Sequence, residues 1–388
     1  MTSTERAYVS GIYEHPLRSA PDKTVAQLHA EVASGALADA GLEPRDVDAY
    51  FCAGDAPGLG GLSMAEYMGL RLRHIDTTET GGPSYISHLN HAVRAIAAGK
   101  CSVALITLAG RPRAAKSSGK EARVYSADAP DLPYELPFEP SMVALYGMVA
   151  QRHMHEFGTT SEQLAWIKVA ASQHAQHNPQ ARLPKVVSVE DVLASPSIST
   201  PLHRLDCCVV TDGGGAVVVT AGSIARSLGK PLVGILGAGE SIKHQSGGRV
   251  DLTYSAAAQA GAEAFAEAGV TPADIDYASI YDSFTITALM QLEDLGFCEK
   301  GAGGRFVSDG GLVSGSGHLP FNTDGGGLCN NHPDNSGGIT KIIEAVRQLR
   351  GSAQAAVQVP DCELALASGI GGSLATRHSS AVAILRRE

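Results

Sequence analysis

The sequence predicts a duplicated α/β fold, because a unit of helix, turn and buried strand occurs twice along the chain. The stretches ALADAGLEPRDVDAY (36–50) and AFAEAGVTPADIDYA (264–278) match in helix end, glycine stop, proline turn and strand entry. Farther along, HAVRAIAAG (91–99) corresponds to EAVRQLRG (344–351), and an apolar strand follows each. Ordered repeats of this kind indicate two α/β halves with right-handed crossovers and mixed, largely buried sheets.

The first half is expected to alternate helices with buried strands. Residues 24–41 and 84–99 have the apolar spacing of helices, and a strand at 103–108 follows the second helix. Residues 111–142 are polar and contain prolines, which indicates an excursion from the core. Two helices, an irregular stretch and two strands are then expected, at 143–157, 161–177, 195–206, 208–210 and 216–220.

The second half repeats the alternation. Its expected elements, in chain order, are a strand at 233–236, a helix at 256–269, a strand at 278–281, a helix after residue 338, and strands at 364–368 and 380–385. We therefore divide the chain into a first half at 1–225, with a loop-domain insertion at about 111–205, and a second half at 226–388.

The composition excludes several classes of protein. A net charge of −10 argues against a nucleic-acid backbone or an anionic membrane as the main partner. The seven cysteines are odd in number and form no CxxC pair, so neither a disulfide framework nor a structural zinc site is indicated. No apolar run approaches the roughly 20 residues that span a bilayer, and the first residues lack the apolar core of a signal peptide. We expect a cytoplasmic protein that binds no metal.

A glycine-rich stretch, FNTDGGGLCNNHPDNSGG (321–338), contains His332 and leads into an apolar helix. The apolar residues of that helix recur at three- and four-residue spacing. A long irregular loop ahead of such a helix is a common place for a rigid scaffold to present chemistry. Spacing alone leaves open the alternative of a surface connection whose glycines serve only turns.

The chain resembles the thiolase superfamily, and within it the sterol-carrier-protein-type branch of lipid-transfer thiolases. The motifs that carry the resemblance are PLHRLDCC with TDGGGAVVV (201–219), YDSFTITALMQLEDLGFC (281–298), FNTDGGG (321–327), NNHP (330–333), EAVRQLRG (344–351) and GIGGS (369–373). The resemblance implies a five-layered αβαβα fold with an inserted loop domain, usually assembled as a homodimer. It also implies carbon–carbon bond chemistry on an acyl-CoA thioester, with coenzyme A as part of the substrate and no separate cofactor.

The sequence departs from the family at both of its cysteines. A thiolase has a nucleophilic cysteine at the start of the helix that begins here near Ser84, where the helix dipole favours a thiolate. The corresponding position is Gly82, or Ser84 after a slip of two residues. The second family cysteine corresponds to Ser283, and its other common location to Gly369. What remains is His332, which in thiolases activates the nucleophile and helps bind a thioester oxygen.

These departures favour aldol or retro-aldol chemistry without a covalent acyl-enzyme. A hydroxyl without an adjacent base is a poor nucleophile, whereas a thioester enolate needs only an oxyanion site and a proton carrier. The pattern is similar to thiolase-like aldolases that shorten steroid CoA esters, which act with a small OB-fold, zinc-bearing partner protein but carry a tyrosine at the position of His332. The alternatives are an acyltransferase without the usual cysteines and a non-catalytic acyl-CoA or lipid carrier or scaffold subunit.

Five residues are the candidates for the chemistry. We expect His332 to move a proton and Tyr281 to donate to an oxyanion, although Tyr281 at a strand end is also compatible with the core. Ser283 is a candidate for proton transfer or for positioning water, or it only fills space. Gly82 and Gly371 would act through their backbone N–H groups, or serve tight packing.

Other candidates would contact the substrate or support the site. Ser84 is the alternative nucleophile position, Asp324 is a candidate to orient His332, and Cys329 is either a replacement nucleophile or a buried, inert thiol. Loops at 111–142 and 240–255 are expected to shape the acyl pocket. A homodimer is expected to form through the strand at 103–108, taken as an edge strand.

Overall fold

The computed structural model describes residues 5–117, 141–243, 251–333, 337–372, 374 and 377–388. The loops expected to shape the acyl pocket fall largely on 118–140 and 244–250, outside the described residues. Among the described helices, none is both long and apolar enough to cross a bilayer.

One mixed sheet runs through the molecule, in the order β3-β2-β4-β7-β1-β8-β11-β10-β9. Its strands are β1 (Ala7–Glu14), β2 (Ala49–Phe51), β3 (His74–Asp76), β4 (Val103–Gly110), β7 (Gly213–Ala221), β8 (Val233–Lys243), β9 (Tyr277–Ile280), β10 (Leu364–Gly371) and β11 (His378–Arg387). Strand β2 is parallel to β3 and β4, and β9 is parallel to β10, whereas the other pairs are antiparallel. The two halves join at β1 and β8, which pair only at Tyr8 and Gly234.

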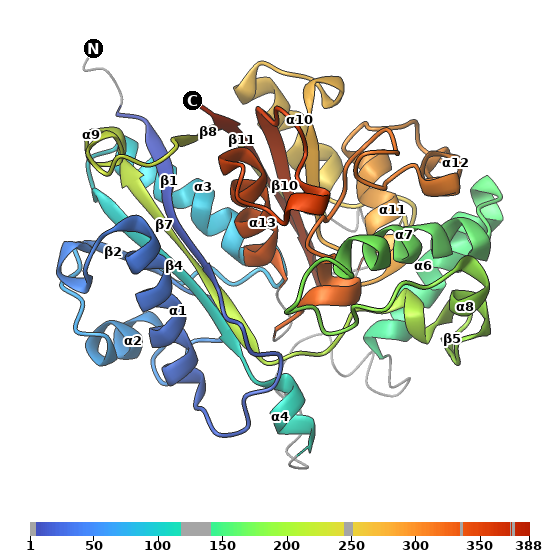
Figure 1. Cartoon of the computed structure of the whole chain (residues 1–388), viewed down its shortest axis with the longest axis horizontal. Coiled ribbons are helices and arrows are strands. Elements are labelled where there is room, and N and C mark those ends of the chain that lie inside the picture. The colour runs from blue at the N-terminus through green and yellow to red at the C-terminus, as the bar shows by residue number, and fades with distance from the viewer. Residues whose placement is uncertain (1–4, 118–140, 244–250, 334–336, 373, 375–376) are drawn as a thin grey trace.

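Helices cover both outer faces and fill the space between the halves (Figure 1). Helix α1 (Val25–Ala40) packs on β1, β4 and β7, and α10 (Ala257–Ala268) packs on β8 and β11. Helices α3 (Ser84–Ala97) and α13 (Gly338–Arg350) pack against each other and against strands of both halves. The order of layers is therefore αβαβα, as the resemblance implies, and the expected duplicated fold is confirmed.

The duplication extends to the contacts between helix and strand. A Cβ atom at Gly11 would lie 2.2 Å from the carbonyl oxygen of Ala36, and one at Gly237 would lie 2.1 Å from that of Ala264. Each pair joins the first strand of a half to its outer helix, at matching positions of the repeated sequence. Glycine at these strand positions lets the helix backbone approach closely, so the same packing solution serves both halves.

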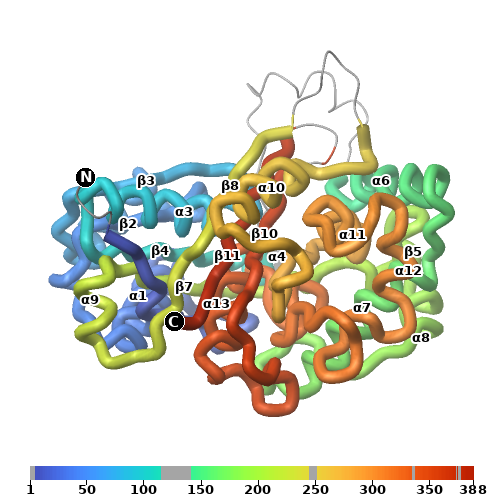
Figure 2. Tube along the Cα trace, turned by 90° about the horizontal axis from the view of Figure 1, so that it is seen from above, coloured from blue at the N-terminus to red at the C-terminus, as the bar shows by residue number. Residues whose placement is uncertain are grey.

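The helices inserted in the first half contact the second half mainly through α7 (Ser161–Ala175). They are α6 (Met142–Phe157), α7 and α8 (Val189–Ala194), and they gather beside α11 (Thr285–Asp294) and α12 (Gly303–Val307) (Figure 2). The Tyr146 and Phe284 rings, with centroids 4.9 Å apart, are one contact across this boundary. The insertion therefore covers the segments of the second half that carry the site described below.

Shorter elements complete the described chain. They are α2 (Gly61–Tyr67), α4 (Pro112–Ser117), α9 (Gly222–Ser227), β5 (Ser197–Ser199), β6 (Leu202–His203), the 3-10 turns at Pro44–Asp46, Arg204–Asp206, Pro272–Asp274, Ser308–Gly310 and Ala355–Val357, and one π-helical turn, η6 (Gly326–Asn330).

The expected edge strand of the first half is wrong. Strand β4, which contains residues 103–108, lies between β2 and β7, and the edge of this half is the short strand β3. The apolar run of β4 reflects burial on both faces of the sheet and pairing on both sides, which is the pattern of an interior strand. The homodimer itself stays a prediction, but it cannot form through β4 as proposed.

Candidate active site

Tyr281 and His332 form the centre of the candidate site. Tyr281 directly follows β9, and its backbone N–H donates to the Ser368 carbonyl on β10 over 2.9 Å. His332 follows the turn η6, and its Nε2 lies 2.8 Å from the Tyr281 hydroxyl. Both side chains are buried, with 4% and 9% of the residue exposed. Two residues 51 positions apart are thus brought into a direct hydrogen bond.

The environment gives these two side chains complementary proton chemistry. Burial, and next the positive charge of Lys341, lower the pKa of His332 to about 4. Burial raises the pKa of Tyr281 well above its usual value. Near neutral pH the imidazole is therefore uncharged and can accept a proton, while the phenol keeps its proton and can donate a hydrogen bond.

Two glycines close one side of this pair. A Cβ atom at Gly82, just before α3, would lie 2.1 Å from the Ile370 carbonyl oxygen and 2.9 Å from the Tyr281 ring. A Cβ at Gly371 would lie 2.2 Å from the Thr80 carbonyl oxygen and 2.9 Å from the Gly82 nitrogen. Neither position has space for a side chain, so the backbone itself lines the site next to Tyr281.

A buried ion pair supports the turn that carries His332. The Asp282 carboxylate accepts hydrogen bonds from Lys341 Nζ (2.8 Å) and from the backbone N–H groups of Gly327 (2.8 Å) and Leu328 (3.1 Å). Both charged side chains are almost fully enclosed. This pair is not among the residues that the sequence motifs select, although a lysine between the apolar residues of α13 indicates a buried partner.

Comparisons with known proteins identify the family. The family model described as thiolase C-terminal domain-like matches residues 239–387. Over 355 residues the chain is 33% identical to an acetyl-CoA acetyltransferase of Methanothermobacter thermautotrophicus, covering 88% of this chain and 90% of that protein. It is 34% identical over 359 residues to a steroid side-chain-cleaving aldolase of Thermomonospora curvata, covering 89% and 90%. The chain belongs to the thiolase superfamily.

One solved structure is similar to this chain over nearly its whole length. The structure titled Ltp2-ChsH2(DUF35) aldolase superposes with a TM-score of 0.89 at 32% identity, covering 98% of each chain. The resemblance drawn from the motifs is therefore confirmed, together with the expectation of a thiolase-fold enzyme on acyl-CoA. The relatives bear both kinds of activity name, acetyltransferase and aldolase, so the site has to distinguish between them.

In this superfamily member, both candidate serines have hydrogen-bond partners other than Tyr281 and His332. The Ser84 hydroxyl donates to the Gly81 carbonyl (2.7 Å) and accepts from the Thr80 N–H (2.9 Å), which ties it to the turn before α3. The Ser283 hydroxyl lies 3.4 Å from the Thr287 hydroxyl on α11. Ser84 therefore shapes the glycine turn rather than facing the pair.

Asp324 binds the loop that precedes His332 rather than the imidazole, and Cys329 is buried within that loop. The Asp324 carboxylate accepts from the Gly326 N–H (2.9 Å) and from the Asn330 side-chain amide (2.9 Å). Cys329 is fully buried within η6. Burial raises the pKa of its thiol, which is the property of an inert cysteine rather than of a nucleophile.

The other cysteines of the chain are, like Cys329, poorly suited to act as a thiolase-type nucleophile. All seven cysteines lie in the described part of the chain, and none of them forms a disulfide. Burial raises the pKa of each thiol, to about 11 or 12 where the value is resolved; they are Cys52, Cys101, Cys207, Cys208, Cys298, Cys329 and Cys362. A thiolate at neutral pH, which acyl transfer through cysteine requires, is therefore disfavoured at all seven positions.

Proposed function

We propose that this protein cleaves a carbon–carbon bond of a β-hydroxyacyl-CoA ester by retro-aldol chemistry, without a covalent acyl-enzyme. One observation carries the proposal: neither candidate position for the thiolase nucleophile presents one, because the Tyr281 ring and the Ile370 carbonyl fill the space of a side chain at Gly82, and the Ser84 hydroxyl is bound to the turn before α3. Beside it lies a hydrogen-bonded acid–base pair, Tyr281 and His332. This arrangement suits proton transfer and oxyanion stabilisation rather than acyl transfer.

The proposed steps use groups of this chain alone. The uncharged His332 takes the proton of the β-hydroxyl group, the bond between Cα and Cβ breaks, and the β-oxygen becomes the carbonyl of the departing ketone or aldehyde. The bonding electrons move into the thioester, which becomes an enolate. Tyr281 and the backbone N–H groups of Gly82 and Gly371 stabilise its oxygen. The proton on His332 then returns to Cα, so the step consumes no further reactant.

The names of two relatives support a proposal for the substrate and the partner. The aldolase of Thermomonospora curvata is named for steroid side chains, and the structure that superposes over 98% of the chain is titled with a DUF35 protein. We therefore propose an acyl-CoA with a bulky β-carbon as the substrate class. We also propose a small OB-fold, zinc-bearing protein as partner, and a homodimer as the assembly.

The test is a reaction panel with two parallel readouts. A series of β-hydroxyacyl-CoA esters is incubated with the protein, with and without the candidate partner, and both the shortened acyl-CoA and the released carbonyl product are quantified. Intact mass after incubation with acyl-CoA donors reports any covalent adduct. We expect both products and no adduct. A stable acyl adduct with acyl transfer to a second CoA ester would establish the acetyltransferase alternative, and tight binding without cleavage would establish a carrier.

A further inference from the structure

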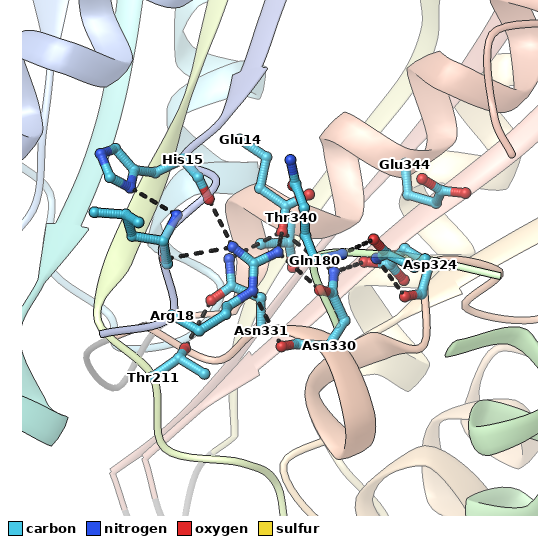
Figure 3. A network of polar contacts seen from close by, with 12 residues as sticks. Glu14, His15, Arg18, Gln180, Thr211, Asp324, Asn330, Asn331, Thr340 and Glu344 are labelled. Carbon is cyan, nitrogen blue, oxygen red and sulfur yellow. Dashed lines mark hydrogen bonds and ion pairs between the residues drawn. The ribbon is translucent and has the colours of Figure 1, made fainter. Parts of the chain in front are cut away.

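Glu14, at the end of β1, is a buried carboxylate that receives hydrogen bonds from four side chains, and Figure 3 labels three of them, Arg18, Asn330 and Asn331. Its Oε1 accepts from Arg18 Nη2 (2.7 Å), Asn331 Nδ2 (3.0 Å) and Asn330 Nδ2 (3.2 Å). Its Oε2 accepts from Arg347 Nη1 (3.1 Å). Only 1% of the carboxylate side chain is exposed. The first half of the chain therefore supplies a buried carboxylate to which the side chains of both Asn330 and Asn331, in the second half, are bound.

The bond from Asn331 to Glu14 fixes the next link in the chain of contacts. With its Nδ2 on Glu14, the amide of Asn331 presents its Oδ1 to the Thr211 hydroxyl, 2.7 Å away. That hydroxyl donates its proton to Asn331 and in turn accepts from the backbone N–H of His332 over 2.9 Å. The backbone of His332 is thus held by three consecutive bonds that begin at a fixed negative charge.

Arg18 holds the residue one step earlier. Its Nη2 and Nε donate to the side-chain and backbone oxygens of Asn330, over 2.8 and 3.2 Å, and its Nη1 donates to the His15 carbonyl (2.6 Å). The Asn330 amide also bonds to Asp324. Because Arg18 pairs with Glu14, loss of the carboxylate would also weaken the position of the guanidinium that donates hydrogen bonds to Asn330.

We propose that Glu14 is a positioning residue of the active site, which acts through Asn331 and Thr211 to hold the His332 ring against Tyr281. An ionised carboxylate has no proton to donate and can accept from several donors at once, whereas an amide at this position lacks the charge and turns its NH2 group toward the donors on one side, either Arg347 or Arg18 with Asn331. The inference rests on the proposed function for the proton that His332 carries. The position of the ring can be measured without any reaction.

A second ion pair provides a matched control for a purely structural role. Asp39, also from the first half, bonds to Arg350 over 2.9 Å, three residues beyond Arg347 on α13. Its other partners are the Ile12 N–H and Lys230, which lie outside the His332 loop. If Glu14 only joined the two halves, then Glu14→Gln and Asp39→Asn would have similar consequences for the site.

The first experiment observes His332 directly by nitrogen NMR of isotope-labelled histidine. The His332 signals are assigned by their loss in His332→Asn, and their shifts report tautomer and protonation. In Glu14→Gln we expect averaging of the two tautomers and a rise in the pKa of His332, because the ring gains access to water when its loop loosens. Asp39→Asn is expected to leave both unchanged. Identical His332 signals in the wild type and in folded Glu14→Gln would overturn the proposal.

The second experiment tests the next link with a conservative pair. Thr211→Val removes the hydroxyl that bonds to Asn331 and His332, and Thr211→Ser keeps it. We expect Thr211→Val and Glu14→Gln to lower kcat on the order of 10- to 100-fold with little change in KM, and Thr211→Ser to restore most of it. The proposal would be overturned if Thr211→Ser lowered kcat as far as Thr211→Val does, and Asp39→Asn as far as Glu14→Gln does. If the wild type cleaves no ester but the His332 signals change in Glu14→Gln, the proposed function fails and this inference stands.

Discussion

Lys341 and Asp282 lie 2.8 Å apart in the interior of the protein, directly beneath the turn that leads to His332. The lysine belongs to α13, and the aspartate follows the catalytic candidate Tyr281. Lys341 is one of the causes that lower the pKa of His332, whereas Asp282 binds the backbone of η6. The pair therefore lowers the pKa of the His332 imidazole through Lys341 and stabilises the loop that carries it through Asp282.

Substitution of Asp282 by asparagine is expected to be strongly destabilising. It leaves the ammonium of Lys341 buried without a charged partner, which typically costs about 3–5 kcal/mol of unfolding free energy. The double variant Asp282→Asn/Lys341→Met removes both charges and should recover a large part of that loss. Urea unfolding measures the difference, with Glu156→Gln as control, because its exposed pair with Arg152 is worth less than about 1 kcal/mol. Equal effects of the buried and exposed substitutions would contradict the role of the pair.

Removal of the Tyr281 hydroxyl is expected to slow turnover without weakening the binding of acyl-CoA. Loss of one oxyanion donor typically lowers kcat roughly 10²–10³-fold, because the bond strengthens only as the enolate forms. The measurement is cleavage of the best β-hydroxyacyl-CoA by Tyr281→Phe. Tyr277→Phe is the control, since Tyr277 is also buried, begins the strand that Tyr281 follows, and has a hydroxyl that accepts from the Thr323 N–H. Turnover that falls in both variants alike would assign the effect to packing.

His332 and Tyr281 are expected to act as one unit. His332→Asn should lower kcat at least as far as Tyr281→Phe does, and the double variant should be little worse than either single one. Groups that share one hydrogen bond and act in the same step are not additive in kinetics. Full additivity of the two losses, or wild-type turnover in His332→Asn, would mean that the two residues do not act together in the reaction.

A side chain at position 82 is expected to be harmful, and a cysteine there should not create a thiolase. Gly82→Ala places a methyl group on the Ile370 carbonyl and the Tyr281 ring, and such overpacking costs about 1–3 kcal/mol. Gly234→Ala is the matched control, because its methyl group would meet the flexible Glu388 carboxylate at 3.1 Å. Thermal unfolding compares the two. Thiolysis by Gly82→Cys at wild-type stability would contradict the closed backbone seen here.

The stability of the protein is expected to fall as the pH is lowered from about 6.5 toward 4. Four histidines have a pKa lowered by burial, to about 4 or 3; they are His88, His174, His332 and His378. Their unfolded forms bind protons near pH 6.5, so their contribution is complete above that value and is lost toward the folded pKa values.

Thermal midpoints across this range measure the effect, and His332→Asn should flatten the slope. His91 has a pKa raised to about 10 by Asp76 and Glu240, so its contribution is retained below pH 6.5 and is lost only as the pH rises through about 10. Midpoints that rise on acidification would contradict the burial of the four histidines. The acid limb of turnover should likewise lie near pH 4 if His332 is the proton acceptor.

The repeated elements could be predicted because helix ends depend on local residues. The helices expected at 24–41 and 256–269 are observed at Val25–Ala40 and Ala257–Ala268, each closed by a glycine with positive φ. Strand length and order depend on distant partners. Strand β8 continues to Lys243 because β11 pairs along it, and no strand forms at 208–210, whose backbone bonds to Ser283 and Gly327 instead.

The residues of the candidate site also fall into those that could be predicted from the sequence and those that could not. The resemblance to the thiolase motifs was sufficient to select Tyr281, His332, Gly82 and Gly371, which the structure brings together. It could not select Glu14, Asp282 or Lys341, because charged side chains are usually solvated and only the tertiary fold shows that these are enclosed. Asp324 was selected for orienting the imidazole, but it binds the preceding loop.

The central layer of the fold has a consequence for how the chain can be divided. Because α3 and α13 pack against each other and against strands of both halves, each half covers the inner face of the other, and the central core contains residues of both. A cut at the turn around Gly229, between α9 and β8, would yield two fragments with exposed apolar faces. We expect each fragment to remain unstructured when produced separately, and the two to complement each other when co-expressed. Assembly of the two fragments could be followed at His332, because Glu14 and Thr211, which hold it, lie on one fragment and His332 lies on the other.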